Sequence, residues 1–111
     1  MSYKSLYPCT GSKNAPEGVI VVYAEWCPHC KYMEDAFVKT GLASKNVKFV
    51  ALEESKHPKL IEEIRKQVDV RGYPTILLNV NKKMVLAEGP RDAKNFKRLA
   101  QKAAKMMVSK K

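Results

Sequence analysis

The sequence predicts one α/β domain in which helices flank a central mixed four-stranded sheet, with the element order β-α-β-α-β-β-α. The chain has 111 residues, of which 45% are apolar and 29% charged, as expected of a single globular domain that buries its own core. Apolar runs alternate with amphipathic stretches, and a helix is the usual crossover between two parallel strands. A short turn separates the last two strands, so that pair is expected to be antiparallel.

The first third of the chain predicts a strand followed by a helix. Residues 1–18 contain Pro, Gly and Asn at short intervals and are expected to form a lead-in with one short element at most. Residues 18–24 are a β-branched, uninterrupted apolar run, which is typical of a strand buried on both faces. An amphipathic helix follows, and Gly41 is expected to cap its C-terminus. Its apolar residues share one helical face: Met33, Ala36 and Phe37.

The middle of the chain predicts three strands and one helix. Residues 47–52 form the second strand. The second helix is expected to begin near Pro58, because proline suits the first turn of a helix. Residues 75–80 form the third strand, and a turn at residues 81–83 leads into a fourth at residues 84–88. The apolar face of the second helix holds Leu60, Ile61, Ile64 and Val68.

The last predicted helix begins after Asp92, whose carboxylate suits a helix N-cap. Its apolar face holds Phe96, Leu99, Ala100, Ala103, Met106 and Met107. The predicted organisation is therefore a lead-in over residues 1–18, a folded domain over residues 19–107 and a basic tail over residues 108–111.

The net charge of +10 is concentrated near the C-terminus, where residues 91–111 hold eight of the 21 basic residues and one of the 11 acidic residues. A strongly basic chain suggests nucleic-acid binding, but the remainder of this chain is close to balanced. The lysines of the last helix either face solvent or contact a nucleic acid, an acidic protein or an anionic lipid. Aromatic residues do not alternate with them, which disfavours nucleic-acid binding as the main function.

Two of the three cysteines form a C-x-x-C motif, Cys27-Pro28-His29-Cys30, between the first strand and the first helix. Unpaired N–H groups and aligned peptide dipoles make a helix N-terminus positive, which stabilises a thiolate on Cys27. Pro28 suits the first helical position, and His29 adds a positive charge or a hydrogen bond beside the same sulfur. Cys30 lies one turn further in and is expected to be less exposed. The pattern indicates that Cys27 is the nucleophile and Cys30 the resolving thiol.

Other roles for the motif need residues that the chain offers poorly. A zinc site requires two more ligands, and the candidates are Cys9, His29 and His57. Covalent haem attachment requires His directly after the second cysteine, where Lys31 stands. A structural disulfide across two residues closes too small a loop to stabilise the fold much. No resident metal or cofactor is therefore expected. Cys9 is either a free thiol or part of an intermolecular or regulatory disulfide.

The dipeptide Tyr73-Pro74, at the entrance of the third strand, is the second candidate part of the site. A proline in this position is expected at a bend or in a cis peptide bond. A cis Pro74 would leave the backbone of Tyr73 as a short unpaired edge. A substrate segment could then add to this edge as a strand, beside the reactive sulfur.

These two motifs, in this order over this pattern of elements, resemble the thioredoxin superfamily. The matching segments are residues 24–31 and 71–75, followed by Gly89, and the resemblance covers about residues 18–107. It implies the thioredoxin fold with a shortened N-terminal extension. It also implies that Trp26 belongs, with the Tyr73-Pro74 pair, to the surface that binds the substrate.

The resemblance is nearest to the catalytic domains of protein disulfide isomerase in the residues around the motifs. The inner dipeptide, Pro28-His29, is instead that of the periplasmic oxidant DsbA. Thioredoxins have Gly-Pro at these positions, and isomerases have Gly-His. The resemblance therefore leaves open the direction in which thiol–disulfide exchange would run.

Three positions depart from the family pattern. Family members bury an acid beneath the resolving cysteine and pair it with a lysine, and the matching positions here are Val21 and Ala51. The proline that kinks the first helix of the family is replaced by Asp35. The buried acid serves as the general base for the resolving thiol in the family. Here water or a rearranged Glu25 must take the proton from Cys30, and slow reductase turnover is expected.

The predicted function is thiol–disulfide exchange with protein thiols and disulfides through Cys27 and Cys30, with a reductase or an oxidase as electron partner. The redox-active disulfide of these cysteines is the expected redox group, and Pro28 and His29 predict a potential more oxidising than that of thioredoxin. The alternative is a redox-inert module of the same fold whose basic helix contacts nucleic acid or an acidic partner. The chain is expected to be a monomer. Since neither a signal peptide nor a membrane span is visible, a cytoplasmic location is expected.

Overall fold

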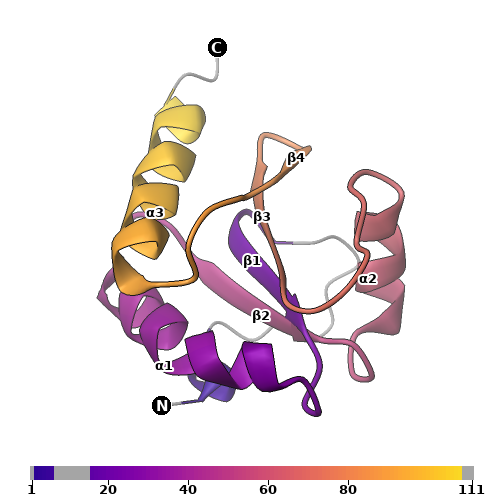
Figure 1. Cartoon of the computed structure of the whole chain (residues 1–111). Helices are drawn as coiled ribbons and strands as arrows, with labels where there is room; N and C mark the ends of the chain where they lie inside the picture. Colours follow the sequence, from indigo (N-terminus) through magenta and orange to yellow (C-terminus); the bar gives the residue numbers. More distant parts are fainter. Residues whose placement is uncertain (1, 7–15, 109–111) are drawn as a thin grey trace.

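The computed structural model describes residues 2–6 and 16–108 of the chain. In chain order, its elements are the short 3₁₀ helix η1 (Tyr3–Ser5), β1 (Gly18–Tyr23), α1 (Pro28–Ala43), β2 (Phe49–Glu53), α2 (Pro58–Arg65), β3 (Thr75–Val80), β4 (Lys83–Leu86) and α3 (Ala93–Val108). The strands form one sheet in the order β2-β1-β3-β4, with α1 and α3 on one face and α2 on the other (Figure 1). The predicted α/β fold with a mixed four-stranded sheet is confirmed.

The central strand β1 explains why its sequence lacks polar alternation. Successive side chains of a strand point to opposite faces of a sheet. Val19 and Val21 pack in the core formed with α1 and α3, whereas Ile20 and Val22 pack in the core formed with α2. All six residues of β1 are buried, so the prediction of a strand covered on both faces is confirmed.

Although the helix α2 lies between β2 and β3 in the chain, β3 is not parallel to β2. β1 pairs in parallel with β2, but β3 is antiparallel to β1 and β4 is antiparallel to β3. The segment 66–74 follows α2 and returns the chain to the end of the sheet where β1 ends, so that Thr75 pairs with Val22. This return brings the start of β3 close to the C-x-x-C motif.

Local interactions set several element bounds that differ from those predicted. The turn between β3 and β4 has two residues, Asn81 and Lys82, because both adopt positive φ angles (56° and 66°) that fit a tight hairpin. β4 therefore begins at Lys83 and ends at Leu86. α2 ends at Arg65, and Val68 lies beyond it but still packs against the apolar core on that face.

Gly41 lies inside α1 and does not cap it, so that prediction is wrong. The helix continues to Ala43, and the N–H of Ser44 donates to the carbonyls of Thr40 and Gly41. A Cβ atom on Gly41 would lie 2.6 Å from Cβ of Phe49 and 2.8 Å from Cδ2 of Leu6. The glycine is therefore required by the close approach of α1 to β2 and to the segment after η1.

The last helix has the two faces that its sequence predicts. Asp92 caps it as expected, since its Oδ1 accepts the N–H of Asn95 at 2.9 Å. Its buried face includes Phe96, Leu99 and Ala103, while the basic residues Lys94, Lys97, Arg98, Lys102 and Lys105 are exposed. Within residues 2–6 and 16–108, no helix has the length and apolar character needed to cross a membrane.

The close approach at Gly41 makes a stability prediction. Alanine normally stabilises a helix interior relative to glycine. Here we expect Gly41→Ala to lower the free energy of unfolding by about 1–3 kcal/mol, because the added methyl group overpacks the core. Gly72→Ala is the matched control, since a Cβ at Gly72 meets no atom within 4 Å. Urea unfolding would measure both. An unchanged or raised stability of Gly41→Ala would contradict the packing described here.

Candidate active site

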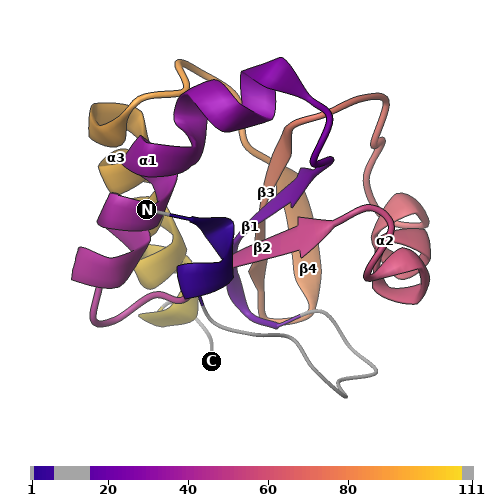
Figure 2. The same cartoon turned by 90° about the horizontal axis from the view of Figure 1, so that it is seen from below.

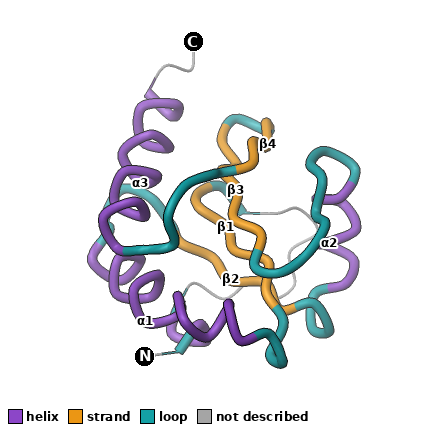
Figure 3. Tube along the Cα trace, viewed as in Figure 1, coloured by secondary structure: helices purple, strands orange, loops and turns teal. Residues whose placement is uncertain are grey.

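Three loops meet at the end of the sheet where β1 ends and β3 begins. They are residues 24–27 before α1, residues 66–74 before β3 and residues 87–92 after β4, all of which appear as loops in Figure 3. Direct contacts join them: the sulfur of Cys27 reaches the backbone of Tyr73, and Tyr73 and Arg91 line one cavity. The two motifs of the sequence, 46 residues apart, thus form one site.

Cys27 is the N-cap of α1, and its sulfur occupies the place of a capping side chain. The turn before it closes through a hydrogen bond from the N–H of Cys27 to the carbonyl of Ala24, at 3.1 Å. Pro28 then starts the helix, and the sulfur of Cys27 accepts the N–H of Cys30 at 3.3 Å. One of the unpaired N–H groups of the first turn is therefore directed at this sulfur, as expected of a site that stabilises a thiolate.

Both cysteines are free thiols and both are buried, with 3% of Cys27 and 1% of Cys30 exposed. Their environments nevertheless differ. Burial raises the pKa of the Cys30 thiol to about 12, and its hydrogen bond with Cys27 adds to the shift. The backbone of Ala24 and the positive charge of Arg91 act in the opposite direction. Cys30 is thus held as a protonated thiol behind the sulfur of Cys27.

The Tyr73–Pro74 peptide bond is cis, as the position of the proline predicts. The thiol of Cys27 donates a hydrogen bond to the carbonyl oxygen of Tyr73 at 3.4 Å. The backbone of Tyr73 therefore lies directly beside the sulfur. A peptide segment paired with this backbone would pass over Cys27.

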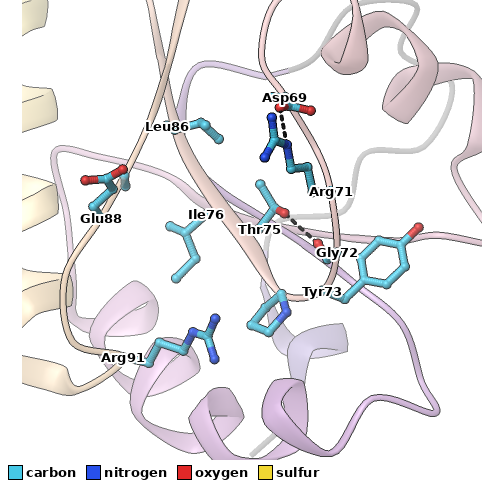
Figure 4. Close-up of a pocket in the computed structure, with 11 residues that line it drawn as sticks. Asp69, Arg71, Gly72, Tyr73, Thr75, Ile76, Leu86, Glu88 and Arg91 are labelled. Atoms are coloured by element: carbon cyan, nitrogen blue, oxygen red, sulfur yellow. Dashed lines mark hydrogen bonds and ion pairs between the residues drawn. The ribbon is translucent and has the colours of Figure 1, made fainter.

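A cavity of about 460 Å³ borders the Tyr73-Pro74 segment on the side of β4. Figure 4 shows the side chain of Arg91 reaching into it from the loop before α3, while Ile76 and Leu86 supply apolar surface. Asp69 accepts a hydrogen bond from Nε of Arg71 at the opposite rim. The cavity therefore combines apolar walls with a guanidinium group at each end, and the guanidinium of Arg71 is paired with Asp69.

Exposed Trp26 and half-buried Tyr73 form an aromatic rim beside Cys27. The Trp26 side chain is 68% exposed, and its ring meets that of Tyr73 edge-on with centroids 5.9 Å apart. Glu54 fixes both rings, because its carboxylate accepts the indole N–H of Trp26 at 2.8 Å and the hydroxyl of Tyr73 at 3.5 Å. Glu54 has no signal in the sequence, since this role depends on two long-range contacts.

Glu53 is a buried carboxylate that the sequence also gave no reason to select. It is 4% exposed and accepts the N–H of Glu25 at 3.1 Å and the N–H of Ser55 at 2.7 Å. Burial alone would raise the pKa of Glu53, but hydrogen bonds from Ser55 and from the backbone of Glu25 outweigh burial and hold it below its usual range. Its anchored carboxylate fixes the turn that presents Cys27.

His29 is exposed in the first turn of α1. Among the described residues, no hydrogen bond joins its ring to either cysteine. The structure therefore brings Cys27, Cys30, Pro28, Trp26, Tyr73 and Pro74 together, but gives His29 no direct bond to the sulfur. Cys9, the third cysteine, lies outside the described residues.

The positions that depart from the family pattern are apolar or remote from the sulfurs. Val21 and Ala51 are register partners on β1 and β2, and Val21 is fully buried beneath the site. Asp35 faces solvent and pairs with Lys39 at 3.5 Å. In the part of the chain that the structure describes, no group of three or more His, Cys, Asp or Glu residues is arranged to hold a metal ion.

Comparisons with known proteins agree with this geometry. The thioredoxin family pattern matches residues 11–104. Curated relatives include a protein disulfide-isomerase of Ricinus communis, 33% identical over 79 residues, and protein disulfide isomerase-like 1-1 of Arabidopsis thaliana, 34% identical over 82 residues. The matches cover 68% and 70% of this chain but only 16% of either relative. The chain thus spans about a sixth of their length.

Solved structures show the same fold. Mitochondrial thioredoxin 3 of Saccharomyces cerevisiae superposes with a TM-score of 0.65 at 24% identity, and the match covers 92% of this chain and 99% of that one. The first two thioredoxin domains of Eps1p from the same yeast give a TM-score of 0.67 at 18% identity, covering 85% of this chain and 39% of that one. With the matched family pattern, the two motifs and the fold, the chain belongs to the thioredoxin family.

Proposed function

We propose that this chain is a thiol–disulfide oxidoreductase that exchanges disulfides with protein substrates through Cys27 and Cys30. The observation that supports it most is the environment of the Cys27 sulfur. It caps α1, accepts the N–H of Cys30 and lies 3.4 Å from the carbonyl of Tyr73. The same sulfur can therefore be stabilised as a thiolate and meet a disulfide bound along the Tyr73 backbone.

In the reductive direction, the thiolate of Cys27 attacks one sulfur of a substrate disulfide. A bond forms between Cys27 and that sulfur, the substrate S–S bond breaks, and the other substrate sulfur leaves as a thiolate that takes up a proton. Cys30 then loses its proton and attacks the Cys27 sulfur. The Cys27–Cys30 disulfide forms, the second substrate sulfur is released as a thiolate, and two electrons have passed to the substrate. Oxidation is the reverse, and neither direction requires a bound cofactor.

The surface around the sulfur supports a polypeptide as substrate. A strand added along the Tyr73 backbone gains main-chain hydrogen bonds that do not depend on its sequence. Trp26 offers an exposed aromatic face on one side, and the cavity beyond Pro74 has room for a side chain on the other. Arg91 at one end of this cavity offers a cation to an acidic side chain of the substrate, whereas Arg71 at the other end is already paired with Asp69.

We expect Cys27→Ser to abolish exchange. Insulin reduction and the oxidation of reduced ribonuclease should each fall by about 10²-fold or more, because serine cannot replace the thiolate as nucleophile and leaving group. Cys9→Ser is the matched control and should keep the activity of the parent protein. If neither activity depends on Cys27, the protein is a redox-inert binding module of this fold and the proposal fails.

We also propose that the pair is more oxidising than thioredoxin. The helix N-terminus, with the exposed imidazole of His29 in its first turn, favours the reduced thiolate, and stabilising the reduced form makes the disulfide a stronger oxidant. We expect a reduction potential above about −270 mV in equilibrium with glutathione buffers. Replacing Pro28-His29 by Gly-Pro should lower the potential. A parent value at or below about −270 mV would contradict the proposal.

A further inference from the structure

Attack by Cys30 requires that its thiol first lose a proton, and burial makes this loss difficult. The pKa of Cys30 is raised to about 12, so very little thiolate exists at neutral pH. On β1 and β2, beneath this thiol, the positions that hold an acid and a lysine in the family are occupied by Val21 and Ala51, which are register partners and cannot accept a proton. A proton acceptor must therefore approach from another direction.

A polar cavity opens on the other side of Cys30. Its volume is about 320 Å³, which is room for several water molecules, and its lining includes Cys30 together with Tyr3, Tyr23, Glu25, Lys31 and Glu34. It lies between the start of α1 and the 3₁₀ helix η1, which packs beside α1 and β2 (Figure 2). Among the described residues, these side chains are the titratable groups that line this cavity.

Most of these groups are unsuited to accept a proton. Burial raises the pKa of Tyr3 far above its usual range and that of Tyr23 to about 12, so both phenols stay protonated. Lys31 is a cation without a lone pair to offer. The carboxylate of Glu25 is 60% exposed and pairs with Lys56 at 3.3 Å, so a cation already engages it at the rim of the cavity.

Glu34 differs from them in both placement and chemistry. It follows Cys30 by four residues on α1, so the two side chains lie on one face of the helix, one turn apart. Its carboxylate is half-buried and accepts the backbone N–H of Tyr3 at 2.9 Å. The Tyr3 hydroxyl in turn donates to the carbonyl oxygen of Cys30. One residue of the lead-in thus binds both ends of the Cys30–Glu34 turn.

We infer that Glu34 accepts the proton of the Cys30 thiol, through water in this cavity, when Cys30 attacks the mixed disulfide at Cys27. The proton passes from the Cys30 sulfur to water and from water to the Glu34 carboxylate. The Cys30 sulfur forms a bond to the Cys27 sulfur, the bond between Cys27 and the substrate breaks, and its electron pair leaves with the substrate sulfur. Tyr3 is a positioning residue that holds Glu34 beside the cavity. The inference rests on the proposed function.

The two sulfur steps can be separated with dithiobis-nitrobenzoate as the probe. In a Cys9→Ser parent, attack by Cys27 releases a first nitrothiolate at a rate that rises with probe concentration. Attack by Cys30 then releases a second nitrothiolate at a rate that does not depend on probe concentration. We expect Glu34→Gln to slow the second release by about tenfold or more and to leave the first within about twofold. The amide oxygen of Gln can still accept the N–H of Tyr3, so the fold should be kept, and thermal unfolding checks this.

Two further carboxylate variants test whether the effect is specific. Asp35→Asn removes the neighbouring charge on the exposed face of α1 and should change neither release. Glu25→Gln removes the other carboxylate of the cavity and should leave the second release within about twofold of the parent. The inference would be overturned if Glu34→Gln kept the second release within about twofold of the parent rate. It would also be overturned if Glu25→Gln slowed the second release as much as Glu34→Gln does, or if Glu34→Gln slowed both releases equally. A parent without the first release would show instead that the proposed function itself is wrong.

Discussion

The site depends on the contacts that fix Cys27 in place between the end of β1 and the start of α1. The helix N-terminus supplies an N–H to its sulfur, the buried carboxylate of Glu53 anchors the turn before it, and the cis Tyr73–Pro74 segment faces it. The contacts of Glu53 and Tyr73 require the sheet to bring β1, β2 and β3 together in the observed register. A change in the direction of β3 would move Tyr73 to the far end of the molecule and leave the sulfur without the Tyr73 backbone beside it.

The two sulfurs differ because the protein surrounds them differently. Cys27 lies at the positive end of a helix beside a loop, whereas Cys30 lies one turn inside, against apolar β1 residues and a short lead-in helix. The raised pKa of Cys30 keeps its thiol protonated at neutral pH. The apolar pair Val21 and Ala51 stabilises the core but provides no group for proton transfer.

Sequence patterns predicted the features that depend on local order. The apolar run of β1, the helix start at Pro28, the cap at Asp92 and the cis bond at Pro74 each follow from residues close together in the chain. Features made by distant contacts were missed or assigned wrongly. Gly41 was predicted to be a helix cap, but a glycine is required there because Phe49 and Leu6 leave no room for a Cβ atom. The roles of Tyr3, Glu53 and Glu54 depend on contacts with residues about 30 positions away in the chain, which no local sequence pattern predicts.

In the proposed function, Cys27 reacts as the nucleophile while Cys30 is held as a protonated thiol. Pulse alkylation of the reduced protein with iodoacetamide, followed by mass spectrometry of the peptide that contains both cysteines, measures this directly. At neutral pH the label should appear on Cys27. Because alkylation requires the thiolate and burial raises the pKa of Cys30, labelling of Cys30 in a Cys27→Ser variant should be slow at neutral pH and should rise by about tenfold per pH unit while the thiol remains mostly protonated. Labelling of Cys30 at neutral pH as fast as that of Cys27 would contradict the account.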